Sequence, residues 1–256
     1  MIPKKLHYIW IGGNPLPDLA KKCIESWKKF CPDYEIVAWD ESNLNIDINE
    51  YCREAYDARK FAFASDVLRY DVVYREGGIY MDIDVELIKP IDDMLENKMF
   101  LGFENPKCVN PGLIMGAEAG SEVIKELIDA YNGQHFVNEN GEYNYKTICE
   151  RCTEYLVEKL GFKTDNTLQN LDGKVVVYPT EYFCPFNLDD TKMKQTENTR
   201  SIHWFNGSWV PKLPLGTRIK NGIKELIKKI LGEKNVKKLK AKFKKNKSQQ
   251  PVEKEK

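Results

Sequence analysis

The chain of 256 residues is 42% apolar and 11% aromatic, a composition that supports a packed core and excludes a wholly disordered chain. Its formal net charge is zero, but residues 216–256 contain fifteen Lys or Arg and four Glu, so they carry +11 and residues 1–215 carry −11. We therefore expect an acidic domain at 1–215 and a basic tail at 216–256.

Seven irregularly spaced cysteines predict reduced thiols, and the absence of a signal-peptide or membrane-spanning pattern predicts a cytoplasmic protein.

The first forty residues predict a strand, a helix and a second strand. Residues 4–12 are typical of a buried strand, and residues 18–30 place apolar side chains on one helical face, with Asp18 as a candidate N-cap. Residues 34–40 predict the second strand. This β-α-β opening favours an α/β domain with a parallel sheet.

The centre of the chain predicts a helix followed directly by a strand. Residues 57–76 have the clearest helical periodicity, and Gly77–Gly78 supplies the glycine expected after a helix end. Residues 79–88 then predict one continuous strand. Further along, the sequence predicts strands at 112–117 and 174–179, helices at 121–131 and 146–160, and an aromatic loop or short strand at 203–210.

Two aspartates, Asp82 and Asp84, stand in the predicted strand at 79–88. Side chains at positions i and i+2 of a strand point to the same side, so the two carboxylates should project together while Ile83 points into the core. Two adjacent carboxylates repel each other, and a divalent cation removes that repulsion. Oxygen ligands favour Mg²⁺ or Mn²⁺, which keep positions open for phosphates. The alternative is a pair of solvated aspartates in a loop.

Asp66 and Arg69 are three residues apart on the predicted helix and share one face. Beside a metal–phosphate site they would bind sugar hydroxyls and offset pyrophosphate charge. The alternative is an ordinary ion pair on a helix surface, which would contribute about 0.5 kcal/mol.

Three segments carry a resemblance to a known family: IPKKLHYIWIGG, ASDVLRYDVVYREGGIYMDIDVELIKP and HWFNGSWV. In this order they resemble the sugar-binding-region glycosyltransferases that contain a DxD motif. That family includes yeast initiating α-1,6-mannosyltransferases, α-1,4-galactosyltransferases and bacterial capsule and lipopolysaccharide enzymes, with the large clostridial glucosylating toxins as more distant relatives. The resemblance extends over residues 2–210 and leaves the tail uncovered.

The resemblance implies a GT-A fold, which is a Rossmann-like nucleotide-sugar-binding fold, and a set of site residues. Catalytic roles are implied for Asp66, Arg69, Asp82 and Asp84. Asp84 is implied as a direct metal ligand, and His203 or Ser208 would complete the metal shell. Asp82 would bind the ribose and sugar, or would reach the metal through a water. Nucleotide binding is implied for Trp10, Ile9, Asp82 and Trp209, and sugar binding for Asp66, Arg69, Asn110, Gly78 and Tyr80.

The implied activity is a retaining, metal-dependent transfer of a hexose from a nucleotide sugar to a saccharide or lipid-linked saccharide, in bacterial capsule or lipopolysaccharide synthesis. A UDP-sugar is the first choice of donor and GDP-mannose the second, with Mn²⁺ or Mg²⁺ as the cofactor. Front-face attack and a covalent enzyme nucleophile both stay open as routes to retention. A metal-dependent nucleotide-sugar hydrolase or phosphodiesterase and a non-catalytic sugar-binding module remain as alternative functions.

The basic tail has an amphipathic pattern over residues 218–243, with Ile and Leu on one stripe and Lys on the other face. Such a helix favours an anionic membrane surface, where each Lys contributes about 1 kcal/mol. We therefore expect a peripheral protein on the inner face of the plasma membrane. A solvated helix and a subunit contact are alternatives. Nucleic-acid binding is not expected, because the body is acidic and the tail has few aromatic residues.

Overall fold

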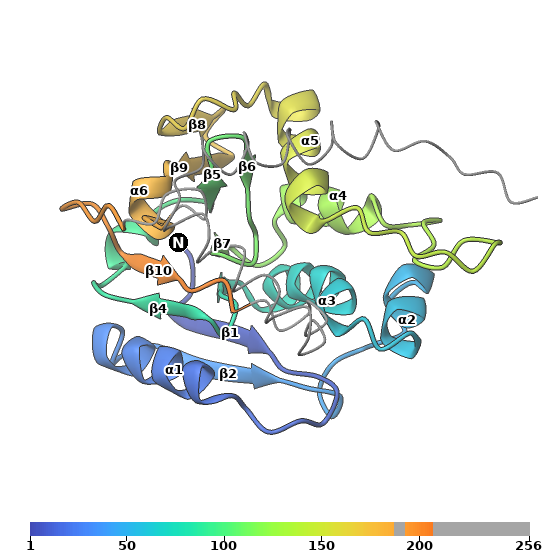
Figure 1. Cartoon of the computed structure of the whole chain (residues 1–256). Helices are drawn as coiled ribbons and strands as arrows, with labels where there is room; N and C mark the ends of the chain where they lie inside the picture. Colours follow the sequence, from blue (N-terminus) through green and yellow to red (C-terminus); the bar gives the residue numbers. More distant parts are fainter. Residues whose placement is uncertain (187–192, 207–256) are drawn as a thin grey trace, which may run out of the picture. The chain divides into compact units, whose positions relative to one another are not determined.

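The computed structural model describes residues 1–186 and 193–206. Its main sheet has the strand order β2-β1-β3-β7-β5-β9-β8, with β6 paired to β5, and β4 and β10 form a separate two-stranded sheet (Figure 1). The strands are β1 (Lys5–Ile9), β2 (Glu35–Trp39), β3 (Gly78–Tyr80), β4 (Val85–Leu87), β5 (Met99–Asn105), β6 (Cys108–Val109), β7 (Met115–Ala117), β8 (Gln169–Leu171), β9 (Val175–Tyr178) and β10 (Ser201–His203). The helices are α1 (Asp18–Phe30), α2 (Glu50–Asp57), α3 (Phe61–Glu76), α4 (Glu122–Asp129), α5 (Ile148–Leu160) and α6 (Thr180–Phe183), with a 3₁₀ turn at Asp92–Met94.

Most strands of the main sheet run in the same direction. β1 pairs in parallel with β2 and β3, and β5 pairs in parallel with β9. β7 lies antiparallel between β3 and β5, so β3 and β5 also share a direction. The carboxyl ends of β1, β3 and β5 therefore meet at one edge, which is where α/β sheets bind ligands. The predicted α/β class and its β1-α1-β2 opening are confirmed.

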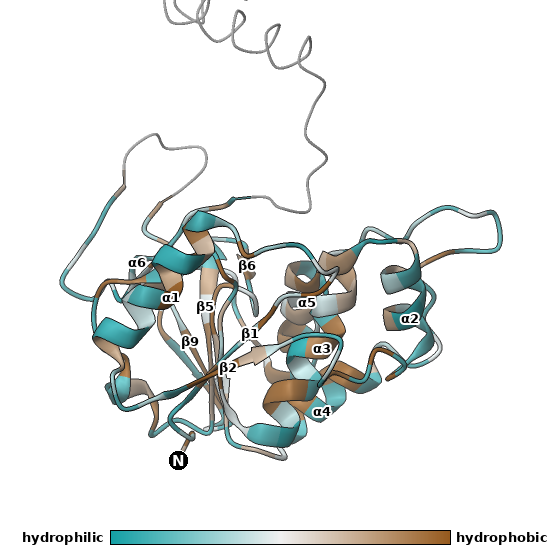
Figure 2. Ribbon diagram, turned by 90° about the horizontal axis from the view of Figure 1, so that it is seen from below, coloured by the Kyte–Doolittle hydropathy of each residue, from teal (hydrophilic) through white to brown (hydrophobic). Residues whose placement is uncertain are grey.

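The sheet separates two apolar cores. One core joins α2, α3, α4 and α5 to the sheet, and the other joins α1 and α6 to it. Figure 2 shows these two groups of helices on opposite sides of the strands. A strand buried on both faces needs apolar residues throughout, as β7 and β3 have.

Helix α1 has the predicted bounds, but Asp18 is not its N-cap. The N-cap is Pro17, which makes no side-chain capping bond, and Asp18 is the first helical residue. Ala20, Cys23 and Trp27 form the buried face of the helix. The indole N–H of Trp27 donates to the backbone oxygen of Val85 at 2.8 Å, so α1 is tied to β4.

The predicted helix at 57–76 was wrong at its beginning. Residues 50–57 form a separate helix, α2, which the side chain of Asn49 caps, and α3 begins at Phe61. Gly77 follows the end of α3 with a φ of 63°, a conformation that glycine adopts without strain, so the predicted stop is confirmed. Ten of the sixteen residues of α3 are buried, including the charged Asp66 and Arg69.

The predicted continuous strand at 79–88 was also wrong. It is interrupted by a turn at 82–85, in which the N–H of Val85 donates to the oxygen of Asp82 at 3.0 Å. β4 then leaves the main sheet and pairs antiparallel with β10, which comes much later in the chain. In this pairing His203 lies opposite Val85. Acidic residues are poor strand formers and favour turns. Asp82 and Asp84 consequently lie on a turn, and Ile83 is partly exposed rather than buried.

Several elements were not predicted, namely α2, α6 and the strands β5, β6 and β8. The tail predictions, which are the boundary at 215/216 and the membrane-binding helix at 218–243, lie outside the described residues. Within the described part of the chain, no helix is long and apolar enough to cross a membrane.

Candidate active site

Several of the predicted site residues lie at the carboxyl edge of the sheet. Trp10 follows β1, the aspartate turn follows β3, and Gly112 precedes β7, which begins at the same edge because it runs the opposite way. The N–H of Asp82 donates to the backbone oxygen of Gly112 at 2.8 Å. The turn is thus fixed to the segment that leads into β7.

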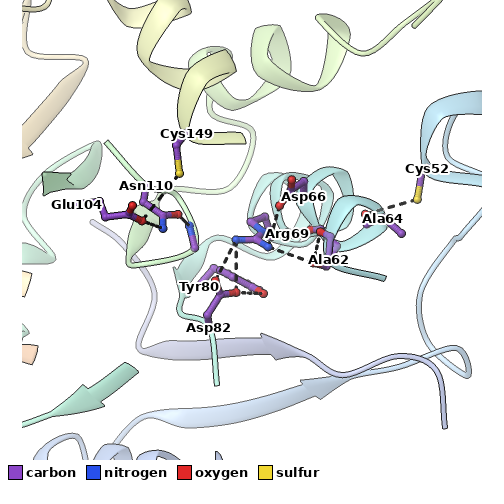
Figure 3. Close-up of polar contacts among 12 residues, drawn as sticks. Cys52, Ala62, Ala64, Asp66, Arg69, Tyr80, Asp82, Glu104, Asn110 and Cys149 are labelled. Atoms are coloured by element: carbon purple, nitrogen blue, oxygen red, sulfur yellow. Dashed lines mark hydrogen bonds and ion pairs between the residues drawn. The ribbon is translucent and has the colours of Figure 1, made fainter. Parts of the chain in front are cut away.

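Arg69 connects helix α3 to the aspartate turn (Figure 3). Its Nη2 lies 3.0 Å from Asp66 Oδ1, and its Nη1 lies 3.4 Å from Asp82 Oδ1. The Arg69 side chain is only 5% exposed, and its guanidinium lies 4.9 Å from the centre of the Tyr80 ring. An arginine stays charged when it is buried, and its planar group can contact two carboxylates at once. The predicted Asp66–Arg69 pair is therefore an interior ion pair that extends to Asp82.

Asp82 is held by Arg69 and Tyr80. The Tyr80 hydroxyl donates to Asp82 Oδ1 at 2.9 Å, and 31% of the Asp82 side chain remains exposed. Burial raises the pKa of Asp82, and the charge of Asp84 raises it further, while Arg69 and His203 act in the opposite direction. The exposed fraction leaves this carboxylate open to a ligand.

Asp84 has a different set of partners. Its Oδ1 lies 3.3 Å from His203 Nε2, and its Oδ2 accepts the N–H of Asn206 at 2.9 Å. Burial opposes its ionisation, but these hydrogen bonds outweigh burial and hold the pKa of Asp84 below its ordinary value. Burial likewise opposes charge on His203, yet Asp84 raises the His203 pKa above its usual range. The two aspartates thus face separate partners across one turn.

The donor set at this turn fits a hard divalent cation. In the described ranges no group of three or more His, Cys, Asp or Glu has the geometry of a metal centre, and Ser208 lies outside those ranges. Mg²⁺ and Mn²⁺, however, commonly take one or two carboxylates from the protein and the rest of their ligands from water and phosphates. Nδ1 of His203 is buried without a hydrogen-bond partner. Asp82 and Asp84 are therefore the carboxylates that this turn would supply to such an ion.

Asp66 is the most deeply buried carboxylate of the site. Burial raises its pKa to about 7, although Arg69 and Arg151 favour the ionised form. The backbone N–H of Ile148, at the first turn of α5, also favours the charged form. Helix N-termini stabilise negative charge, so α5 also favours the ionised form of Asp66.

Sequence reasoning missed Gly112 and Glu104. A Cβ on Gly112 would lie 2.2 Å from both Arg69 Nη1 and Asp82 Oδ2, so a larger residue would displace that ion pair. Asn110 Oδ1 accepts the Gly112 N–H at 2.6 Å, and Asn110 Nδ2 donates to Glu104 Oε2. The Asn-Pro-Gly sequence at 110–112 is a turn signature that could have indicated the glycine, whereas no local pattern indicates Glu104.

The remaining predicted residues lie at varied depths. Trp10 is partly exposed at the end of β1, and its indole N–H donates to the Asn14 oxygen at 2.5 Å. Ile9 belongs to the apolar core. Gly78 lies against β1, where a Cβ would come within 2.9 Å of Lys5 and His7 atoms. Trp209, like Ser208, falls outside the described residues.

Two curated proteins are similar in sequence to parts of this chain. The chain is 26% identical over 196 residues to the Subversion of eukaryotic traffic protein A of Legionella pneumophila, covering 62% of this chain and 30% of that protein. It is 30% identical over 135 residues to Inositol phosphoceramide mannosyltransferase 3 of Schizosaccharomyces pombe, covering 50% of this chain and 36% of that protein. The chain thus spans about a third of the length of these relatives.

One solved structure, titled PaToxG Glycosyltransferase, aligns with a TM-score of 0.48 and 18% identity over 62% of this chain and 70% of that one. The family model described as a glycosyltransferase sugar-binding region containing a DXD motif matches residues 17–101. That stretch includes Asp66, Arg69, Asp82 and Asp84, which are the core of the site. Residues 17–101 are therefore similar to the glycosyltransferase sugar-binding regions containing a DXD motif, in agreement with the resemblance found in the sequence.

Proposed function

We propose that this protein transfers a hexose from a nucleotide sugar to a saccharide acceptor through a GT-A type site. The observation that carries the proposal is the buried Arg69, which contacts Asp66 on one side and Asp82 of the DXD motif on the other. This arrangement presents a fixed positive charge and two carboxylates at the ligand-binding edge of the sheet. The match of residues 17–101 to the glycosyltransferase family model favours a transferase over the alternative functions.

Each site residue would bind a different part of the nucleotide-sugar donor. Asp66 accepts hydrogen bonds from the sugar hydroxyls, and Arg69 offsets charge on the diphosphate. Trp10 stacks on the base, because a flat indole gives a large contact area at little entropic cost. Asp84 and Asp82, with His203, hold a divalent cation. A bound cation supplies several kcal/mol of stabilisation for the charge that develops on the leaving diphosphate.

The donor and the acceptor are the finer parts of the proposal. A UDP-hexose is the first candidate from the sequence resemblance, and the mannosyltransferase name of a relative strengthens GDP-mannose as the second. The acceptor is a saccharide or a lipid-linked saccharide of bacterial capsule or lipopolysaccharide synthesis, and transfer retains the anomeric configuration. Residues 218–243 would hold the enzyme on an anionic membrane surface, near such a lipid-linked acceptor.

The test is nucleotide release from a panel of UDP- and GDP-sugars, with Mn²⁺, Mg²⁺ or EDTA. We expect slow release from one donor, which EDTA and Asp84→Asn both abolish. Asp18→Asn is the matched control, because it removes a carboxylate whose side chain is 99% exposed on α1. Release at full rate without any acceptor would favour the hydrolase alternative. Sugar binding without metal and without release would favour the non-catalytic module.

A further inference from the structure

Glu104 is a carboxylate that the proposed division of roles leaves unused. It lies near the carboxyl end of β5 and is partly exposed. Its Oε2 accepts a hydrogen bond from Asn110, and the Cys149 thiol lies 4.0 Å from the same oxygen (Figure 3). Both partners are neutral. No Lys, Arg or His within residues 1–186 and 193–206 forms an ion pair with Glu104 that would balance its charge.

Asn110 and Gly112 connect Glu104 to the Arg69–Asp82 pair. Asn110 Oδ1 lies 3.0 Å from the position where Gly112 would carry a Cβ, and Arg69 Nη1 and Asp82 Oδ2 each lie 2.2 Å from that same position. On the other side of the turn, the charge of Glu104 also acts on His203, after the larger effects of burial and the two aspartates. Glu104 therefore belongs to the same site as the DXD motif.

Glu104 thus lies near other carboxylates, while both of its own hydrogen-bond partners are uncharged. A carboxylate in this position would have a use if positive charge developed near it during the reaction. In glycosyl transfer, cleavage of the sugar–phosphate bond leaves positive charge on C1 and on the ring oxygen of the sugar. A negative charge that is already in place stabilises this transition state without reorganisation.

We propose that Glu104 is a catalytic carboxylate that contacts the transferred sugar and stabilises the positive charge developing at C1. The inference rests on the proposed transfer. In that step the C1–oxygen bond to the diphosphate breaks and both electrons go to the diphosphate oxygen. The acceptor oxygen bonds to C1, and the acceptor proton passes to the departing diphosphate. Glu104 forms no covalent bond in this step.

Two substitutions separate this role from a structural one. Glu104→Gln keeps an oxygen that can accept the Asn110 hydrogen bond but removes the charge, whereas Glu104→Ala removes both. If Glu104 only orients Asn110, the Gln variant should behave as wild type and the Ala variant should be impaired. If the charge acts on the sugar, both variants should be impaired to a similar extent.

The experiment measures kcat for nucleotide release and transfer with the active donor, and nucleotide affinity by calorimetry. We expect Glu104→Gln and Glu104→Ala each to lower kcat by about 100-fold, with nucleotide affinity changed by less than threefold. We also expect sodium formate or azide to restore part of the activity of the Ala variant, because a small anion can occupy the vacated position. Glu158→Gln, an exposed change on α5, is the control and should match wild type.

A Gln variant with at least a third of the wild-type kcat would overturn the role of Glu104 while leaving the transferase intact. A loss confined to nucleotide affinity, with kcat retained, would overturn it as well. Wild-type protein that releases no nucleotide from any donor would overturn the proposed transfer and this inference together.

Discussion

Replacement of Gly112 by Ala tests whether the Arg69–Asp82 pair must hold its observed position. The added Cβ would lie 2.2 Å from Arg69 Nη1 and 2.2 Å from Asp82 Oδ2. Ordinary van der Waals contact begins near 3.4 Å, so both groups must retreat by about 1 Å. Misplacing a positioned group by this distance costs about 100-fold in rate, equivalent to about 2.7 kcal/mol of transition-state stabilisation.

The control for this substitution is Gly116→Ala in β7. Its Cβ would lie 2.1 Å from the Phe100 ring, a comparable overlap in the apolar core away from the charged pair. Overpacking of either kind costs about 1–3 kcal/mol of folding stability. We expect both variants to melt at a lower temperature, but only Gly112→Ala to lose kcat.

The assay is initial-rate nucleotide release at a temperature where circular dichroism shows each variant to be folded. A Gly112→Ala enzyme whose kcat is within threefold of wild type would refute the reasoning. It would mean that the ion pair can move without consequence, or that Arg69 and Asp82 do not act on the donor.

Three further predictions concern charge and pH. Arg69→Lys should lower kcat/KM by about 100-fold, because one ammonium group cannot contact Asp66 and Asp82 together; steady-state kinetics would show it, and equal activity would contradict it. The pKa of Asp66 is raised to about 7 from 3.8, so the folded state keeps a proton that the unfolded state has lost, and stability falls as pH rises through about 7. The change in melting temperature caused by Asp66→Asn should therefore be more favourable at pH 8 than at pH 5, and an equal change at both would count against burial as the cause. His7 is buried, accepts the indole N–H of Trp39 at 3.1 Å, and has a lowered pKa; stability should fall by at most about 1.4 kcal/mol per pH unit below pH 6.5, and denaturant titrations should show a flatter slope for His7→Gln.

Local rules were sufficient for much of the fold. The spacing of apolar residues predicted α1, α3, α4 and α5, and the glycine at 77 predicted where α3 ends. These features depend on neighbours within one or two turns of helix, which is why a single sequence reveals them. The same rule placed Asp66 and Arg69 on one face of α3, and the structure shows them as an ion pair at 3.0 Å.

The short elements were less predictable. Strands such as β5 and β8 carry no distinctive alternation. Helix α2 was not predicted, and only its last residue falls within the helix expected at 57–76. Their limits depend on which other segments they pack against. The Asn49 cap of α2 was present in the sequence as a start signal and was not used.

The sequence by itself determined the β-α-β opening, the long central helix and the identity of the Asp66, Arg69, Asp82 and Asp84 set, because periodicity and a compact motif carry that information. Only the tertiary structure decided how those groups are used. Pairing of β4 with β10 bends the chain between the two aspartates, so that Asp82 faces Arg69 and Asp84 faces His203. Insertion of β7 between β3 and β5 brings Gly112 and Glu104 to the same edge. Such contacts join residues far apart in the chain, and their energy depends on sheet order, which no local pattern encodes.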